Sequence, residues 1–398
     1  MTTQTGEPLD FPIPRDTPLD PPRIYSELRR ECPVRRVRLY NGRTPWLVTR
    51  YADVRTVLSD PRFSSVRSWP YQPSASRSAA ERGEKSFTAM DPPEHTRFRK
   101  QLARYFSVKQ VQALRPAVEQ IVDRQLSVIN AAEQPLDLVS RFAFPVASQA
   151  MCELIGVPYA DHEWFESLAH VRSIMNADPD DADHATEELL DYVDRLVGQK
   201  LERRSGDLTS RLVTDLLEPG LVAREELVPI IRLLLTAGYE TTATMIGTGV
   251  FVLLNHPDQL ERVRTDRTLL PGTVEELLRY ISMLHTTIVR VAKQRVDLGG
   301  SRVEPGDGMI VTPAAANKDP DRFPDPDHFD ITRDARGHIA FGYGVHQCLG
   351  QQVARLELEI VFDRLLDRLP GLRLAVDPDR VEFNDSNLVG VAALPVAW

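Results

Sequence analysis

The most informative stretch of this sequence is Phe341-Gly342-Tyr343-Gly344-Val345-His346-Gln347-Cys348-Leu349-Gly350. Its glycines allow the backbone to bend and to pass close to something flat or bulky. Cys348 stands at the start of a predicted helix, and the free N–H groups of a helix N-terminus stabilise a thiolate. Such a thiolate is either a nucleophile or a metal ligand, whereas a lone cysteine is more commonly a buried structural residue. A role for Cys348 as a catalytic nucleophile is not supported, because the sequence around it lacks the motifs of papain-like or caspase-like proteases.

A second signal is a predicted helix over 224–254, which places an acid and hydroxyls inside an apolar tract around Glu240 and Thr241. A transmembrane helix is excluded because Arg232 and Glu240 would lie in lipid. The alternative without a functional role is a core helix whose threonine hydroxyls donate hydrogen bonds to backbone carbonyls. Burying Glu240 without a partner would cost several kcal/mol, so an acid beside a hydroxyl is better explained as a proton relay.

Two pairs of charged side chains are weak signals on their own. Glu276 and Arg279 have the i, i+3 spacing found on many exposed helices, where a pair contributes only ~0.2–0.5 kcal/mol. His95 and Arg99 share one face of a helix that Asp91 is expected to cap and that runs past residue 106. Taken alone, this face is more simply a solvated polar surface.

Taken together and in this order, the motifs resemble those of the cytochrome P-450 family in its soluble bacterial, actinobacterial form. The resemblance covers nearly the whole chain and extends to Trp46–Tyr51, Phe323–Asp327 and Ala393–Pro395. It implies a mainly α fold with small β-sheets (α+β), in which a long central helix lies over a haem. It also implies haem b as the cofactor, with Cys348 as the axial ligand of the iron, whose thiolate favours cleavage of the O–O bond.

The resemblance also implies roles for the other motif residues. Ala237 and Gly238 leave room for dioxygen, and Glu240 and Thr241 deliver protons to its distal oxygen. The Glu276–Arg279 pair locks its helix to the meander before the cysteine loop. Carboxylates at a pocket edge need charge-assisted bonds of roughly 1.5–3 kcal/mol each. The residues that would bind the haem propionates are His95, Arg99, Arg290 and His346.

The implied function is that of a haem-thiolate monooxygenase, which inserts one oxygen atom of O2 into a hydrophobic small molecule by hydroxylation or epoxidation. The chain shows no flavin- or nicotinamide-binding glycine loop and no iron–sulfur cysteine set. Electrons are therefore expected from a ferredoxin and its ferredoxin reductase. Two alternatives remain: a nitric oxide reductase of the same fold fed directly by NAD(P)H, and a non-enzymatic haem sensor. The Glu240–Thr241 pair argues against the reductase.

Partner and substrate contacts are predicted from charge and position. Arg97, Lys100 and Arg104 form a basic cluster at which an acidic ferredoxin could dock, because the local potential steers association. The substrate pocket is expected to involve 64–87, 165–190 and 285–289, with Trp69, Tyr71 and Ile288 as candidate contacts. A mostly apolar pocket suits a natural product, a steroid or a foreign compound.

Composition restricts the class of protein. The chain has 398 residues, a formal net charge of −9 and three cysteines, with a pI near 5.6. An acidic surface argues against nucleic acid as a partner. Few, widely spaced cysteines indicate a reducing compartment. No signal peptide or membrane anchor is recognised, so we expect a cytoplasmic protein without membrane contact.

The chain is expected to form a single domain over 1–398, because no repeat or long linker interrupts it. The proline-rich residues 1–22 should form an extended arm on the body. Asn41-Gly42 predicts a hairpin between Val34–Leu39 and Trp46–Thr49. Surface loops are expected over Ser64–Lys85 and Asp178–Asp183, and short strands followed by a meander over Val291–Pro326. Helices are predicted over roughly 108–132, 141–155, 161–175, 185–204, 224–254, 273–282 and 349–369.

Overall fold

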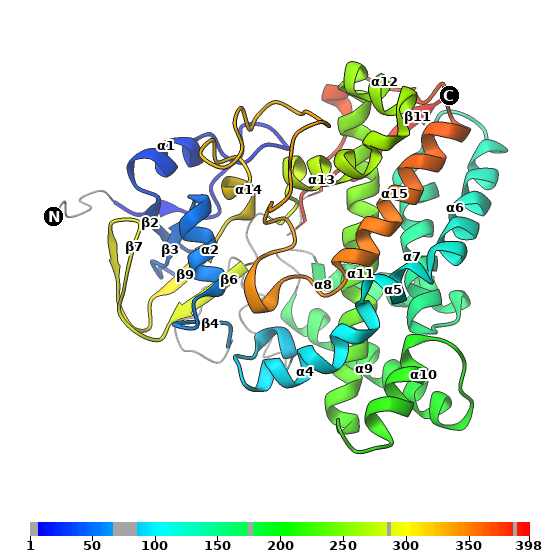
Figure 1. Cartoon of the computed structure of the whole chain (residues 1–398), viewed down its shortest axis with the longest axis horizontal. Coiled ribbons are helices and arrows are strands. Elements are labelled where there is room, and N and C mark those ends of the chain that lie inside the picture. The colour runs from blue at the N-terminus through cyan, green and yellow to red at the C-terminus, as the bar shows by residue number, and fades with distance from the viewer. Residues whose placement is uncertain (1–6, 67–85, 174–177, 285–287, 385–387) are drawn as a thin grey trace.

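The structure, a computed structural model, describes residues 7–66, 86–173, 178–284, 288–384 and 388–398. Figure 1 shows a helical part with the long helix α11 (Arg224–Leu254) running through it, and a smaller part built on the sheet near the N-terminus. The fold is mainly α with small β-sheets, as the sequence predicted. The other described α-helices are α1 (Ile24–Glu31), α2 (Tyr51–Ser59), α4 (Glu94–Ala103), α5 (Val108–Gln112), α6 (Arg115–Asn130), α7 (Phe144–Ile155), α8 (His162–Ser173), α9 (Pro179–Glu202), α10 (Leu208–Leu212), α12 (Pro257–Thr265), α13 (Leu270–Ile281), α14 (Pro313–Ala316) and α15 (Gln351–Arg368).

Helix α11 has the predicted bounds, 224–254. Its start is defined by Glu226, whose carboxylate accepts a hydrogen bond from the backbone N–H of Ala223 at 2.9 Å. Buried residues lie on nearly every side of the helix, as expected for a helix at the centre of a domain. It packs against α7, α9 and α15, and a Cβ added to Gly249 would lie 2.6 Å from Phe362 of α15. Glycine therefore permits the close approach of these two helices.

The predicted start of α4 at Asp91 is wrong. The helix begins at Glu94, with Pro93 as its N-cap, and a separate 3-10 turn over 104–106 follows its end at Ala103. The Asp91 carboxylate instead accepts a hydrogen bond from the backbone N–H of Ser65 at 2.9 Å and pairs with Lys293 at 3.3 Å. Tertiary contacts thus use a side chain that local sequence rules assign to a cap.

Two further predictions along the helical region are corrected. The acidic stretch Asp178–Asp183 is not a surface loop, because α9 begins at Pro179 and the Asp178 carboxylate caps it by accepting the Asp180 N–H. The single helix predicted over 108–132 is divided into α5 and α6, with Pro116 in the first turn of α6. Proline is favoured in the first turn of a helix and disfavoured in its interior.

The largest sheet has the strand order β1-β2-β3-β9-β6-β4. The predicted hairpin is confirmed, since β2 and β3 are antiparallel and Val34 pairs with Val48. The described part of the N-terminal arm lies on the body, because β1 runs parallel to β2 and Phe11 is buried. The strands are β1 (Leu9–Asp10), β2 (Val34–Arg38), β3 (Trp46–Val48), β4 (Phe63–Ser64), β6 (Ile288–Ala292) and β9 (Gly308–Val311).

Two small sheets complete the described strands. One pairs β7 (Val296–Leu298) with β8 (Ser301–Val303), and the other has the order β10-β11-β5. Strands β6 to β9 are the short strands predicted from about residue 291, and an irregular meander follows α14. Strands β5 (Leu136–Asp137), β10 (Arg373–Leu374) and β11 (Pro395–Ala397) join the chain terminus to the helical part. Within the described residues, no helix is long and apolar enough to cross a membrane.

Candidate active site

The Cys348 loop is bent as its glycines predict. Gly342 and Gly344 have φ of 71° and 75°, in the left-handed region. A Cβ on Gly344 would lie 2.5 Å from the carbonyl oxygen of Leu58 in α2, so only glycine fits there. The Cys348 N–H donates to the carbonyl of Phe341 at 2.8 Å and closes the loop. This geometry presents Cys348, an exposed cysteine, at the wall of a cavity.

The sulfur of Cys348 lies just before α15, and the N–H groups of Gly350 and Gln351 donate to it. Desolvation raises the pKa of the Cys348 thiol, whereas these N–H groups and the charges of Arg99 and Arg355 act in the opposite direction. A thiolate at this position therefore has hydrogen-bond donors and cations but needs a further positive partner. A metal ion supplies such a partner.

The four predicted anion-binding residues converge at one edge of the cavity. The rings of His95 and His346 lie 4.0 Å apart between centroids, and Arg290 is only 8% exposed. Arg290 and Arg99 come from β6 and α4, and both line the same cavity. The structure therefore brings together the residues that the sequence placed at the propionates.

Three ring nitrogens at this edge have no hydrogen-bond partner among the described residues. Both ring nitrogens of His95 and Nδ1 of His346 are buried without a hydrogen bond among the described residues. Burial lowers the pKa of Arg290 to about 10. Burial, together with the nearby Arg290 and His95, lowers the pKa of His346 to about 3. Unsatisfied donors and crowded cations fit a ligand that brings carboxylates into this edge, as haem does.

The central segment of α11 forms another wall of the cavity, with Ala237, Gly238 and Thr241 in its lining. The Thr241 hydroxyl donates to the carbonyl of Ala237 at 2.8 Å. Glu240 is half-buried, so the expectation of a buried acid here is wrong. It is also not among the described residues that line the cavity. Because Glu240 is partly exposed, its carboxylate does not carry the full cost of burial. That cost is therefore no longer a reason to assign Glu240 to a proton relay.

Gly238 has a packing role that the sequence did not indicate. A Cβ at this position would lie 2.4 Å from Sδ of Met151 in α7. The missing side chain therefore lets α11 and α7 approach closely. Tyr239, at the next position, is buried against Phe165 at 5.7 Å between ring centroids. These contacts fix the rotation of α11 that turns Thr241 toward the cavity.

The buried acid at this site is Glu357 of α15, which the sequence analysis missed. Its side chain is 2% exposed, lines the cavity and hydrogen-bonds to Thr242. Oε2 has no partner among the described residues. Desolvation raises the pKa of Glu357 to about 8, so the carboxyl is largely protonated at neutral pH. The sequence does carry one signal for this buried acid, because Glu357 stands between two apolar residues, Leu356 and Leu358.

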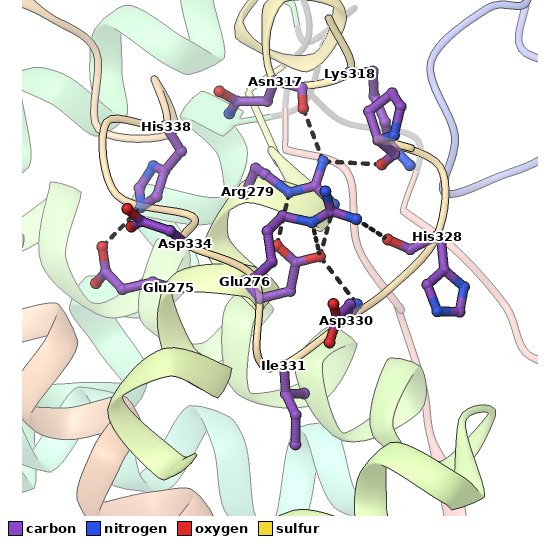
Figure 2. A network of polar contacts seen from close by, with 12 residues as sticks. Glu275, Glu276, Arg279, Asn317, Lys318, His328, Asp330, Ile331, Asp334 and His338 are labelled. Atoms are coloured by element: carbon purple, nitrogen blue, oxygen red, sulfur yellow. Dashed lines mark hydrogen bonds and ion pairs between the residues drawn. The ribbon is translucent and has the colours of Figure 1, made fainter. Parts of the chain in front are cut away.

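The Glu276–Arg279 pair joins α13 to the meander, as expected. Both side chains are fully buried, and Arg279 Nε donates to Glu276 Oε2 at 2.7 Å. Arg279 Nη1 also donates to the carbonyls of Asn317 and Pro326 at 2.8 and 2.9 Å. Figure 2 shows Glu276 and Arg279 at the centre of this network. A second arginine, Arg333, donates from Nε to Glu276 Oε1 at 3.2 Å. Sequence spacing gave no signal for Arg333.

The cavity as a whole has a volume of about 520 Å³ and a mostly apolar lining. Ile288, one of the predicted substrate contacts, lines it. Trp69 and Tyr71 lie outside the described residues. Other apolar residues in the lining include Phe87, Met283, Leu284 and Val289.

The predicted docking cluster is partly neutralised. Arg97 pairs with Glu226 at the start of α11, and Arg104 pairs with Asp215 at 3.2 Å. Lys100 is exposed, and no ion pair is found for it in the described part of the chain. Of the three basic residues, Lys100 therefore has the positive charge that is most accessible to a partner protein.

The fold and the site together define a haem-thiolate protein. The chain belongs to the cytochrome P450 family, whose model, described as "Cytochrome P450", matches residues 143–379. Family members bind haem b through a cysteine thiolate, and the residues at this cavity fit that group. The chain is accordingly a cytochrome P450 monooxygenase.

Curated relatives match over the whole chain. The sequence is 43% identical over 401 residues to a "Vitamin D3 dihydroxylase" from Streptomyces griseolus, covering 100% of this chain and 98% of that protein. It is 40% identical over 399 residues to a "Pentalenic acid synthase" from Streptomyces avermitilis, covering 100% and 99%.

A solved structure with a similar fold is the mycinamicin VIII C21 methyl hydroxylase MycCI from Micromonospora griseorubida bound to mycinamicin VIII. Its TM-score is 0.93 at 38% identity, with 98% of this chain and 100% of that chain covered. The fold predicted from the sequence is thus confirmed.

Proposed function

We propose that this P450 inserts one oxygen atom of O2 into a hydrophobic small molecule, by hydroxylation or epoxidation, in natural-product or xenobiotic metabolism. The main support is one observation: Cys348, Ala237 and Thr241 line the same largely apolar cavity. Relatives named for vitamin D3 and for a macrolide, "20-oxo-5-O-mycaminosyltylactone 23-monooxygenase", agree with a bulky apolar substrate. Apolar walls bury such a molecule and exclude water from it.

In this proposal the residues of the site hold the haem iron at one point and the haem carboxylates at another. When bound, haem supplies the iron at which dioxygen is activated. Cys348 ligates that iron, and the N–H groups of Gly350 and Gln351 hold the sulfur's negative charge. The propionate carboxylates are bound by His95, Arg99, Arg290 and His346, whose polar atoms converge at one edge of the cavity.

Thr241 is the proposed proton donor on α11, supported by its place in the cavity wall. Its hydroxyl donates to the Ala237 carbonyl in this structure. On turning toward the cavity it would donate its proton there, while its oxygen accepts a hydrogen bond from a water or from a protonated Glu240. Thr241→Ala should keep haem binding but lower product formed per electron by about tenfold or more, with peroxide formed instead. The measurement is the ratio of product to peroxide during turnover. Thr241→Ser, which keeps the hydroxyl, should stay near the wild-type ratio; normal coupling in Thr241→Ala would refute the assigned role.

Electrons are proposed to come from a ferredoxin that is itself reduced by a ferredoxin reductase. Lys100 on α4 and Val345 in the Cys348 loop are both exposed, Val345 to 49%. A positive and apolar surface of this kind suits an acidic electron carrier. Nicotinamide-dependent reduction without ferredoxin would instead support the directly fed reductase.

Replacing Lys100 and Arg104 together by glutamate should slow reduction by ferredoxin about tenfold at low ionic strength, because steering of the acidic partner is lost. The measurement is stopped-flow reduction at several salt concentrations. The control is Arg373→Glu on β10, which pairs with β11 far from α4 (Figure 1). Unchanged rates in the double variant would remove this surface from the proposal.

The function is tested by an absorbance titration of the ferric protein against macrolides, terpenoids, steroids and aromatic compounds. A blue shift of the Soret band is expected for the substrate class, because an apolar ligand displaces water from the iron. Product should then form when ferredoxin, its reductase and O2 are added. Binding without product under these conditions would favour a haem sensor.

A further inference from the structure

Helix α13 directs two consecutive acids to two different segments. Glu276 points to Arg279 and the meander, whereas Glu275 points to His338, which precedes the Cys348 loop (Figure 2). The family motif accounts for Glu276 but assigns nothing to Glu275. A partly buried carboxylate that holds two partners from separate elements needs its own explanation.

Glu275 is bound by a side chain from α15. Arg355 donates to both carboxylate oxygens, with Nε at 2.5 Å from Oε1 and Nη2 at 3.1 Å from Oε2. Arg355 Nη1 also donates to the side-chain oxygen of Gln351 at 3.0 Å. The two charged side chains are 19% and 22% exposed, so the pair is shielded from water on most sides. A bidentate geometry fixes the guanidinium plane as well as its position.

The second partner of Glu275 is a neutral histidine. The backbone N–H of Ala340 donates to His338 Nδ1 at 3.1 Å, so this nitrogen has no proton. The ring proton therefore lies on Nε2, which is 3.3 Å from Glu275 Oε2, close enough for an electrostatic contact although the hydrogen-bond geometry is not met. The side chain of His338 is only 2% exposed, which fits an uncharged ring. Formal charges in the group thus cancel: one carboxylate, one guanidinium and one neutral imidazole.

The group is joined to the Cys348 loop at its first residue. The Arg355 guanidinium lies 4.7 Å from the ring centroid of Phe341, and the His338 ring lies 5.8 Å from the same ring. Phe341 in turn accepts the Cys348 N–H through its carbonyl. Arg355 also lies near the start of α15, the helix that follows Cys348 directly. Its packing on Phe341 and its place on α15 therefore bring the charge of Arg355 to the loop that carries the proposed iron ligand.

We propose that Glu275, His338 and Arg355 form a clamp that positions the Cys348 loop on α15. Through the balance of the Glu275 and Arg355 charges, this clamp also sets the reduction potential of the iron that Cys348 would ligate. The proposal rests on Cys348 as the iron ligand. Burial alone would raise the pKa of Glu275, but its bonds to His338 and Arg355 lower it to about 2, so the carboxylate stays charged at neutral pH. Charge near a thiolate-bound iron is one of the protein's means of tuning its potential.

The clamp predicts opposite effects for its two charged members. Glu275→Gln removes a negative charge, which favours the added electron and raises the midpoint potential. Arg355→Gln removes a positive charge and lowers the midpoint potential. The double variant should lie near the wild type, because both charges are gone. A merely structural role would move both single variants in the same direction.

The test is spectroelectrochemical titration of the haem-loaded variants, together with the ferrous–carbonyl spectrum, which reports thiolate ligation. The matched control is Asp194→Asn, which breaks another bidentate pair, with Arg224, away from the Cys348 loop. Glu275→Asp and Arg355→Lys keep the charges and should keep the wild-type potential even if loosened contacts lower their stability.

Opposite shifts in Glu275→Gln and Arg355→Gln, both larger than in Asp194→Asn, are the expected result. Shifts of the same sign, or shifts no larger than the control, would overturn the clamp. If Gln variants lose haem, a shifted potential in Glu275→Asp or Arg355→Lys would also overturn it. A wild-type protein without a thiolate-type carbonyl band would contradict the proposed function instead.

Discussion

Replacing Glu276 by alanine is expected to lower the free energy of unfolding by about 3–5 kcal/mol. The change leaves Arg279, which has no exposed surface, without its carboxylate, and it also removes the partner of Arg333. Breaking a buried pair from one side is costly because the remaining charge is desolvated and unpaired. The backbone N–H of Asp330 loses its acceptor as well. The measurement is the urea unfolding midpoint together with the fraction of protein that retains haem.

The control for this variant is Glu119→Ala. Glu119 pairs with Arg115 at 3.6 Å on α6, where both side chains are about one-third exposed. Exposed pairs of this kind contribute only about 0–1 kcal/mol. Equal losses in the two variants would show that burial of the α13 network adds nothing, and would contradict the prediction.

Glu357→Gln should stabilise the protein at alkaline pH, by roughly 4–5 kcal/mol at pH 8 and above. The pKa of Glu357 rises from the ordinary 4.5 to about 8 on folding. Below 4.5 both states are protonated and the group has no effect. Between 4.5 and 8 the unfolded chain releases the proton while the folded chain retains it, so stability falls as pH rises. Glutamine does not titrate, and the variant escapes this loss.

The measurement is the difference in apparent unfolding free energy between Glu357→Gln and wild type at pH 5 and at pH 8. It should be small at pH 5 and large at pH 8. Asp367→Asn, an exposed change on the same helix, should stay within about 0.5 kcal/mol of the wild type. A pH-independent difference for Glu357→Gln would show that this carboxyl titrates normally in the folded protein.

Local sequence rules predicted the elements whose own residues determine them. The apolar tract of α11 and the Asn41-Gly42 turn gave the right helix and hairpin. The rules failed where a tertiary contact competes with a local one. The Asp91 carboxylate binds Ser65 and Lys293 instead of capping α4, and Asp178 begins a helix where its acidic neighbours suggested a loop.

The sequence predicted those residues of the site that belong to recognisable motifs. Cys348 and the four residues predicted to bind the propionates do meet at one cavity, because fixed spacings place them on α4, β6 and the loop before α15. Glu240 was expected to be buried and is not, since its place on the α11 surface depends on which helices cover it. Glu357, Arg333 and the Glu275 clamp were missed because their partners are distant in sequence.

The most direct test of the central claim is the ferrous–carbonyl absorbance spectrum of the wild type and of Cys348→His. The wild type should show the Soret band characteristic of a thiolate ligand. The variant should bind haem, lose that band and form no product. A wild type without the thiolate band, or a variant that keeps it, would show that Cys348 does not ligate the iron.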